Sequence, residues 1–228
     1  MPSSRGVVAV RRLIDGAGRH RALSVAEPPP LPGPGRRRPG GRTQEVTNRI
    51  FGATVTLLER EGYGGLTYQE LAELAGVSRS TIYRRWPNPA ELALDAMNAT
   101  VRAHVGFPDT GTLEGDLRAT LGQVADFISS RLGSALMAAG LEIRLTNSAK
   151  STAGERWAER VLEVAPLFER ALARGEIAAD FDWELAFAAA SGALYFRTLV
   201  MGRPIDRAWI ERIVADFVQR AAKNQPRR

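Results

Sequence analysis

The sequence predicts an all-α fold of about nine helices, and three observations support that prediction. From Gln44 onward, apolar residues recur three and four positions apart, which places them on one face of a helix. No stretch shows the strict alternation of apolar and polar residues that a half-buried strand requires. Several apolar patterns begin just after a Ser, Thr, Asn or Asp, the residues that most often cap helix N-termini.

The composition is typical of a globular protein and excludes several kinds of chemistry. The chain has 228 residues, of which 44% are hydrophobic, 25% are charged and none is cysteine. Disulfides, thiolate metal sites and cysteine nucleophiles are therefore excluded. The two histidines, His20 and His104, lie far apart in the sequence, so we expect no metal and no cofactor.

The longest uncharged apolar run of the body, Leu185–Phe196, has 12 residues, whereas a membrane span needs about 18. We therefore expect no membrane partner and a cytoplasmic location.

The positive charge is concentrated at the N-terminus. The formal charge of residues 1–43 is +7, and that of the remaining chain is −1. Residues 28–41 read PPPLPGPGRRRPGG, and so many prolines and glycines cannot form a helix or a strand. We predict that residues 1–42 form a disordered basic arm rich in Pro, Gly and Arg. Residues 1–24 carry no pattern of their own, and one account of them is that translation begins near Val25.

The first predicted helix of the body covers residues 43–60 and ends at Gly62. Its inward face, with Phe51 and Val55 beside it, consists of Ile50, Thr54, Leu57 and Leu58. This face should pack against the helices that follow.

Residues 67–86 read TYQELAELAGVSRSTIYRRW and predict two short helices joined by a tight turn. Thr67 starts the first helix with Glu70 as its capping-box partner, Gly76 supplies the turn, and Ser78 caps the second helix. We expect an inward set of Leu71, Ala72, Leu74, Ala75, Val77, Ile82 and Trp86. An outward polar set opens the second helix, as entry into the DNA major groove requires. The pattern is that of a helix-turn-helix.

The next helices follow from similar start signals. Asn88, Pro89 and Glu91 predict a helix that ends near Gly106. The C-terminal half then predicts helices over residues 113–130, 134–146, 153–174, 182–201 and 206–222. Asp182 and Asp206 are expected caps for the last two. Pro166 should kink or split the helix over 153–174.

On these residues the chain resembles the TetR family of transcriptional regulators. The resemblance rests on GYGGLTYQELAELAGVSRSTIYRRWPNPAEL, on the helix before it and on the all-helical half after it. It implies a helix-turn-helix DNA-binding domain over residues 43–88, a linking helix over 89–106 and a ligand-binding and dimerisation domain over 107–228. It also implies a homodimeric repressor of near-palindromic double-stranded operator DNA that a small-molecule effector releases. Activation is the alternative outcome of binding.

The resemblance assigns DNA contacts residue by residue. The start of the recognition helix reads bases in the family, and Arg79 is the best reader because a guanidinium can bond guanine O6 and N7 together. The full set of expected DNA contacts is Arg42, Tyr68, Gln69, Arg79, Ser80, Thr81, Tyr83, Arg84 and Arg85. Among them, Tyr83, Arg84 and Arg85 match phosphate contacts.

The motif departs from the family pattern in its charge. Pro89 stands where family members often carry a lysine, and residues 44–98 have a net charge of −2. Lys and Arg contacts to phosphates supply much of the affinity for DNA. We expect Arg42 and the arginines at 36–38 to supply such contacts from the arm, in the minor groove. The alternative is that Arg36–Arg38 belong to a merely solvated tail.

The C-terminal half yields two further sets of candidates. An effector pocket among helices 113–174 would be lined by Phe127, Met137, Leu141, Trp157 and Val161. No buried charge stands out there, which favours an apolar or aromatic effector. The dimer interface would use the last two helices, through Ala189, Gly192, Phe196, Ile210 and Phe217. Each of these residues has ordinary core packing as its alternative.

Two other classes of function are alternatives to this interpretation. A nonspecific architectural or adaptor protein could use the basic arm alone for nucleic-acid contact. A helical-bundle enzyme is disfavoured, because the chain has no GxSxG, HExxH, P-loop or dinucleotide fingerprint. We therefore expect that the protein is not an enzyme.

Overall fold

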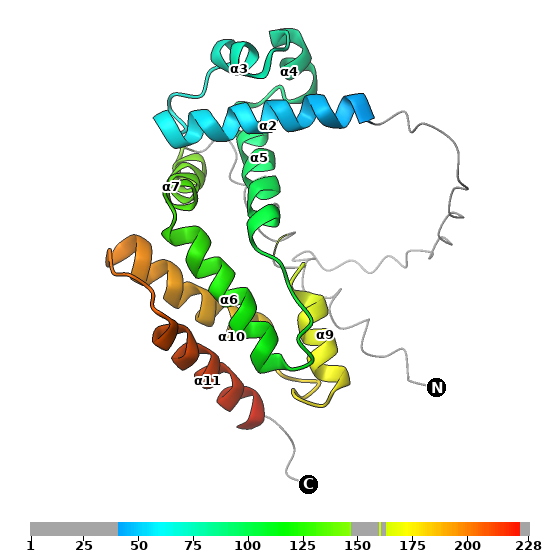
Figure 1. The fold of residues 1–228 in the computed structure, drawn as a ribbon, viewed down its shortest axis with the longest axis vertical. Coiled ribbons are helices and arrows are strands. Elements are labelled where there is room, and N and C mark those ends of the chain that lie inside the picture. The colour runs from blue at the N-terminus through cyan, green and yellow to red at the C-terminus, as the bar shows by residue number, and fades with distance from the viewer. Residues whose placement is uncertain (1–40, 147–159, 161–162, 224–228) are drawn as a thin grey trace, which may run out of the picture. The chain divides into compact units, whose positions relative to one another are not determined.

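The structure, a computed structural model, describes residues 41–146, 160 and 163–223. Over these residues it contains α-helices, one π-helical segment and no strand (Figure 1), so the predicted all-α fold is confirmed. The helices are α2 (Gly41–Glu61), α3 (Tyr68–Ala75), α4 (Arg79–Arg85), α5 (Pro89–His104), α6 (Leu113–Ser129), α7 (Arg131–Leu145), α9 (Ala165–Ala173), α10 (Trp183–Tyr195) and α11 (Arg207–Lys223). None of them has both the length and the apolar character that crossing a membrane demands.

Helix α2 forms the base of the helix-turn-helix. Its inward face is the predicted one, with Ile50, Thr54, Leu57 and Leu58 all buried. The buried hydroxyl of Thr54 donates a 2.8 Å hydrogen bond to the Ile50 carbonyl, so this polar group costs little to bury. The helix ends at Gly62, whose φ of +73° is costly for any residue with a side chain.

An apolar cluster joins α2, α3, α4 and the start of α5. Its most buried members are Ile50, Leu57, Leu71, Ile82 and Leu92. The prediction that Leu74 belongs to this inward set is wrong, because its side chain is 50% exposed. The buried positions of α3 are Leu71, Ala72 and Ala75. At 3.6 residues per turn, the centre of that face lies roughly 100° away from Leu74.

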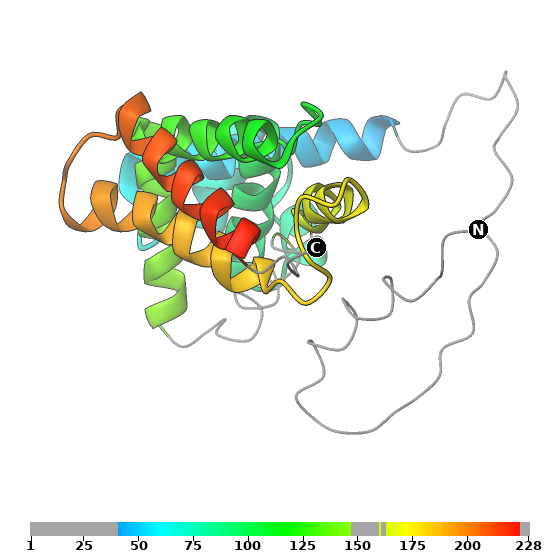
Figure 2. The same cartoon turned by 90° about the horizontal axis from the view of Figure 1, so that it is seen from below.

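A second apolar cluster forms the core of the C-terminal half. It draws on the other face of α5, through Ala93, Leu94 and Met97, and on α6, α7, α9, α10 and α11. Helices α6, α10 and α11 pack against one another in this cluster (Figures 1 and 2). Its centre is aromatic, since the Phe168 ring stacks on Trp183 at 4.7 Å and on Phe217 at 5.8 Å between ring centroids.

Helix α7 begins three residues before its predicted start. Ser130 ends α6 and also caps α7, because its hydroxyl oxygen accepts a 2.9 Å hydrogen bond from the Gly133 N–H. The two helices meet so closely that a Cβ on Gly133 would lie 1.9 Å from the Phe127 carbonyl oxygen. Glycine at this position therefore permits the sharp corner between α6 and α7.

The last three helices follow their predicted signals with one exception. Pro166 lies in the first turn of α9, so the helix described there begins at the proline that was expected to split residues 153–174. Asp182 caps α10 through a 2.9 Å hydrogen bond from the Leu185 N–H, and the Asp206 carboxylate accepts one of 2.7 Å from Trp209. Helix α10 does not continue as an α-helix to residue 201, because residues Phe196–Val200 form a π-helical segment.

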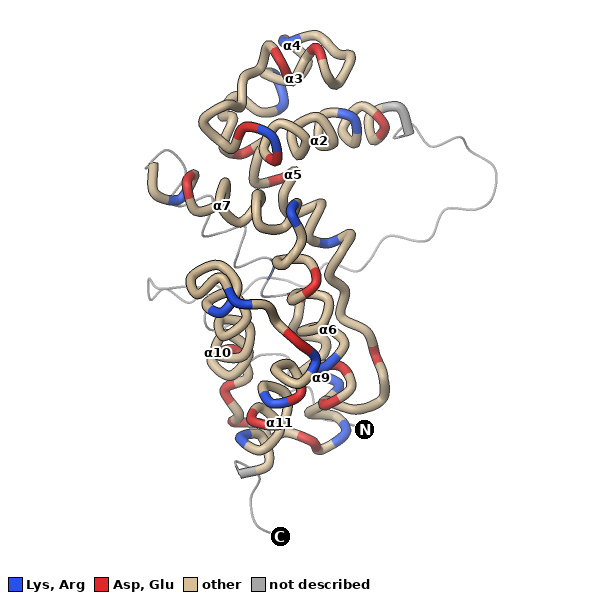
Figure 3. The backbone as a smooth tube through the Cα atoms, turned by 60° about the vertical axis from the view of Figure 1, so that its left-hand side comes forward, with Lys and Arg blue, Asp and Glu red and all other residues tan. Residues whose placement is uncertain are grey.

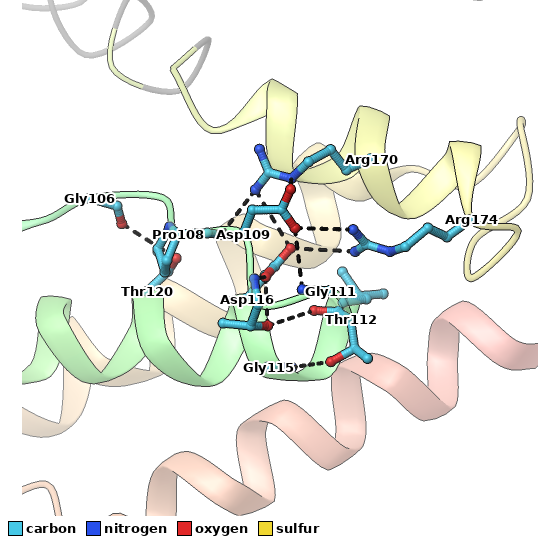
Figure 4. Close-up of polar contacts among 12 residues, drawn as sticks. Gly106, Pro108, Asp109, Gly111, Thr112, Gly115, Asp116, Thr120, Arg170 and Arg174 are labelled. Carbon is cyan, nitrogen blue, oxygen red and sulfur yellow. Dashed lines mark hydrogen bonds and ion pairs between the residues drawn. The ribbon is translucent and has the colours of Figure 1, made fainter.

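A buried carboxylate fastens the loop before α6 to α9 (Figure 4). Asp116 is completely buried and accepts hydrogen bonds of 2.6 and 2.7 Å from the Thr110 N–H and hydroxyl. The guanidinium groups of Arg174 and Arg170 lie 3.4 and 3.6 Å from its other oxygen. The expectation that no buried charge stands out is therefore wrong. The local sequence around Asp116 does not predict these buried ion pairs, since both arginines lie more than 50 residues away.

Several opposing effects act on the pKa of Asp116. Burial alone would raise this pKa, but the two Thr110 hydrogen bonds, and then Arg174 and Arg170, outweigh burial and hold the pKa below its usual value. A group with a lowered pKa in the folded state stabilises the fold above its unfolded pKa, and this contribution is lost as the pH falls through the folded pKa.

We expect Asp116→Asn to lower the free energy of unfolding by about 2 kcal/mol at neutral pH, because it removes the charge that the two arginines and Thr110 hold. The difference from the wild type should shrink as the pH falls through the folded-state pKa of Asp116. Urea unfolding across an acid pH series measures both effects. Asp126→Asn is the matched control, since Asp126 is an exposed residue of the same helix, and it should change stability by less than about 0.5 kcal/mol. A destabilisation independent of pH would contradict the assigned role of the charge.

Candidate nucleic-acid interface

The turn and caps of the helix-turn-helix are those that the sequence predicts. Thr67 caps α3, and its hydroxyl oxygen accepts a 3.3 Å hydrogen bond from the Glu70 N–H. Gly76 lies between α3 and α4 with a φ of +62°, in the left-handed region. Ser78 caps α4 by accepting a 3.3 Å hydrogen bond from the Thr81 N–H. Thr67 and Ser78 therefore act as caps, as expected.

The N-terminal turn of α4 presents its polar residues to solvent. Arg79 and Ser80 are exposed, while Thr81 is half-buried. The Ser78 hydroxyl lies 3.0 Å from that of Ser80 and 2.8 Å from that of Thr81, so the three hydroxyls form a small chain at the helix start. Arg79 and Ser80 are accordingly the most accessible of the three predicted base readers.

Helix α3 contributes a polar residue to the same surface. The Nη1 group of Arg79 donates a 3.4 Å hydrogen bond to Oε1 of Gln69, and Nε2 of Gln69 donates in turn to the Glu73 carboxylate. The structure thus brings together Gln69 and Arg79, two predicted contact residues that lie ten positions apart in the sequence.

Tyr68 is placed differently from the other predicted contacts. Its hydroxyl donates a hydrogen bond to the Trp86 carbonyl, and its ring meets the edge of Tyr83 at 6.1 Å. Burial, followed by the nearby Tyr83, Glu91 and Tyr63, raises the pKa of Tyr68 to about 12, so it remains a donor over the physiological range. Tyr83, by contrast, is 59% exposed and is free to reach a ligand.

The charged residues of α3 are acidic and those of α4 are basic, so the two signs lie close together on this surface (Figure 3). Arg79, Arg84 and Arg85 are exposed, and none of them forms an ion pair within the part of the chain that the structure describes. The Arg85 guanidinium lies 4.6 Å above the Trp86 ring. The side chain of Arg42, and residues 36–38, lie outside the described residues, so their predicted phosphate contacts stay predictions.

Comparisons with known proteins agree with this geometry. Residues 50–96 match the sequence model of bacterial regulatory proteins of the tetR family, and residues 107–217 match that of the tetracyclin repressor-like C-terminal domain. The DNA-binding transcriptional repressor TetR of Mycobacteroides abscessus is 35% identical over 177 residues, which cover 74% of this chain and 90% of that protein. The chain belongs to the TetR family of transcriptional regulators.

Other TetR-family relatives cover a similar share of the chain. The helix-turn-helix transcriptional regulator YdeS of Bacillus subtilis is 28% identical over 183 residues, covering 78% of this chain and 90% of that protein. The solved structure of the TetR family transcription regulator SCO0332 is 30% identical, with a TM-score of 0.66, and the match covers 77% of this chain and 97% of that one. Transcription regulation through a helix-turn-helix is thus the functional class of this TetR-family chain.

The residues predicted to line an effector pocket differ in exposure where the structure describes them, and the pocket itself stays a prediction. Phe127 is 5% exposed within the core, Met137 is half-buried, and Leu141 is 58% exposed on α7. Trp157 and Val161 lie outside the described residues. A groove of about 300 Å³ lies elsewhere, between α10 and α11. Its lining includes Ala186, Ala189, Ala190, Ala193, Trp209, Ile213 and Phe217.

The predicted dimer residues fall into two groups. Ala189 and Phe196 are exposed on α10, and Gly192 and Ile210 are half-buried. Phe217 is only 2% exposed, because its ring packs against Phe168 inside the protomer. Phe217 therefore forms the floor of the groove and belongs to the core of a single chain, a packing that helical spacing alone does not distinguish from an interface.

The described acidic and histidine side chains are dispersed over the structure. Among residues 41–146, 160 and 163–223, no three His, Asp or Glu side chains come together as a metal ion would require. The acidic residues of these ranges are mostly helix caps or members of ion pairs, such as Asp182 and Glu163.

We expect Tyr68→Phe to lower the free energy of unfolding by about 1 kcal/mol, because the Trp86 carbonyl loses its donor. The loss should be constant below pH 10 and should diminish as the pH rises toward the folded-state pKa of Tyr68, where the wild-type hydroxyl ionises and its bond disappears. Chemical denaturation at several pH values measures this dependence. Tyr83→Phe removes the same atom from an exposed ring and should change stability by less than about 0.5 kcal/mol. Equal effects of the two substitutions would refute the assigned roles.

Proposed function

We propose that this TetR-family chain is a homodimeric repressor that binds a near-palindromic operator and leaves it when a small molecule binds the C-terminal half. The observation that carries the proposal is the first turn of α4. It is capped by Ser78 and presents the exposed Arg79 beside Gln69. A recognition helix whose N-terminal residues reach the base edges needs this arrangement.

Arg79 is the central base reader in this proposal. Its guanidinium lies 3.4 Å from the Gln69 amide oxygen and forms no ion pair in the described part of the chain, so it can turn toward a guanine without breaking a salt bridge. Ser80 and Thr81 lie beside it on α4, and the exposed Tyr83, Arg84 and Arg85 lie toward the C-terminus of the helix, where phosphates would pass. Arg42 and the basic arm would add contacts in the minor groove.

We expect Arg79→Ala to weaken operator binding by about 1–3 kcal/mol and to relax the preference at one base pair. Arg84→Ala, the matched control on the same helix, should weaken binding to operator and to random DNA by a similar factor, because a phosphate contact carries no sequence information. Selection of bound fragments from a random DNA pool, followed by anisotropy titrations, measures both. A wild-type protein with equal affinity for selected and random DNA would contradict the proposal and would favour an architectural role.

An unpartnered apolar surface supports the proposed homodimer. Leu185, Phe196 and Val200 on and beyond α10 are 68%, 56% and 69% exposed, and the alanine-lined groove lies next to them. Small residues allow two helices to approach closely, and large exposed apolar patches mark interaction sites. Two copies packed through α10 and α11 would form a four-helix interface and would present two α4 helices to half-sites about 34–36 Å apart.

We expect Phe196→Glu to shift the protein from dimer to monomer, because it places a charge in the proposed interface. Leu141→Glu is the matched control, since Leu141 is 58% exposed but lies on α7, away from that surface. Sedimentation velocity at micromolar concentration should give a monomer for the first variant and an unchanged dimer for the second. A dimer that survives Phe196→Glu would exclude this interface.

The proposed switch works through α5, which both apolar clusters share, and through α7, which contacts α2. Helix α5 contributes to each cluster, and α7 contacts α2 through an Arg131–Glu59 ion pair of 3.3 Å. A small-molecule effector bound in the C-terminal half would favour one arrangement of α5 and α7 and thereby change the separation of the two recognition helices. A coupling of about 1–3 kcal/mol would lower operator affinity about 5- to 150-fold. We propose the cytoplasm as the site of action.

A further inference from the structure

Trp86, at the C-terminus of the recognition helix α4, contacts residues of three neighbouring helices. It caps the C-terminus of α4, and its side chain is 6% exposed. Its ring packs on Phe51 of α2 at 5.6 Å between ring centroids, and its carbonyl accepts the hydrogen bond from Tyr68 of α3. The C-terminal end of α4 is thus held on two sides by groups that do not belong to it.

A third contact connects Trp86 to the linking helix. The indole Nε1–H donates a 2.9 Å hydrogen bond to Oδ2 of Asp95 on α5, in a half-buried setting. Because the acceptor is a carboxylate, this bond is stronger and more directional than a neutral one. The apolar packing of the cluster that contains Ile82 and Leu92 resists separation of the helices, but it defines their orientation less sharply.

The position of Asp95 on α5 links the hydrogen bond of Trp86 to movements of that helix. On one face, α5 places Leu92 in the cluster of the helix-turn-helix. On another, it places Leu94 and Met97 in the core of the C-terminal half. Asp95 lies between these positions, so any rotation or shift of α5 that the C-terminal core imposes moves the carboxylate to which Trp86 is bound. The geometry points to Asp95 as a positioning residue that, through Trp86, sets the orientation of α4 on α5 and thereby the preference for operator DNA.

This inference rests on the proposed function, and it adds a residue that the base-reading motif does not contain. Asp95 does not reach DNA in this assignment. The part of its effect that concerns operator preference passes through the indole, so that part should be lost only once when either member of the pair, or both, is removed.

The test is a double-mutant cycle on Trp86 and Asp95, in full-length protein. Trp86→Phe keeps an aromatic ring but removes the donor, and Asp95→Ala removes the acceptor. Each should weaken binding to the DNA that the wild type selects by about three- to tenfold, the loss expected for one net hydrogen bond. The double variant should lose no more than about the larger single loss, and affinity for scrambled DNA should change less than about twofold.

Two further variants separate positioning from folding. Asp95→Asn retains an oxygen that can accept the indole hydrogen bond, so it should recover most of the operator affinity that Asp95→Ala loses. Asn98→Ala, on the same helix and also half-buried, should bind like the wild type. Thermal unfolding by circular dichroism checks that each variant is folded at the assay temperature. In nitrogen-15 spectra, the indole N–H signal that Trp86→Phe removes should shift in Asp95→Ala and should move little in Asp95→Asn.

The outcomes distinguish the inference from the function on which it rests. If the wild type prefers its selected DNA but the single variants bind as it does, or if their losses multiply in the double variant, Asp95 has no positioning role. Equal losses on operator and scrambled DNA would likewise overturn it. If the wild type itself has no sequence preference, the proposed function fails together with the role of Asp95 in operator choice, and the indole signal would still report whether the hydrogen bond exists.

Discussion

The burial of α5 on two faces is the constraint on which the described fold depends. Leu92 is fully buried among residues of α2, α3 and α4, while Leu94 and Met97 are buried among residues of α6 and α7. Protein interiors are close-packed, so α5 cannot rotate without displacing side chains in both clusters. A rotation of α5 therefore affects the helix-turn-helix and the C-terminal half together. At this point the two parts are joined by a helix and not by a flexible linker.

Buried polar groups define how these apolar clusters are oriented. Asp116 fastens the loop before α6 to Arg170 and Arg174 of α9, and Trp86 joins α4 to Asp95 of α5. Apolar packing supplies most of the stabilising free energy, but it tolerates small rotations of one helix against another. Directional hydrogen bonds to carboxylates restrict those rotations, which would matter for the proposed dimer, where two recognition helices must keep a set separation.

The charges of the helix-turn-helix favour recognition of DNA at short range over long-range attraction. The arginines of α4 lie among acidic residues of α3, such as Glu70 and Glu73, and residues 44–98 have a net charge of −2. Such a surface exerts little long-range attraction on DNA, because opposite charges close together cancel beyond about a Debye length. Under the proposed function, recognition by the helix-turn-helix then depends on contacts at short range, and the orientation of Arg79 and of α4 as a whole is important for them.

The helices, their ends and the helix-turn-helix motif follow from local features of the amino-acid sequence. Caps at Thr67, Ser78 and Asn88, and the turn at Gly76, depend on interactions within four residues of each position, and all of them are as predicted. The surface character of Arg79 follows from the same local pattern. Such features can be predicted because the groups that cause them are neighbours in the chain.

Which residues pack against each face of a helix depends on the tertiary structure. Leu74 is exposed because α3 turns Ala72 inward, and Phe217 is core because Phe168 lies against it. The arginine partners of Asp116 lie more than 50 residues away along the chain, and the Trp86 indole bonds Asp95 on the next helix, nine positions further on. Helical periodicity shows that a side chain has an inward face, but the identity of the opposing surface depends on contacts between distant segments, which local spacing does not encode.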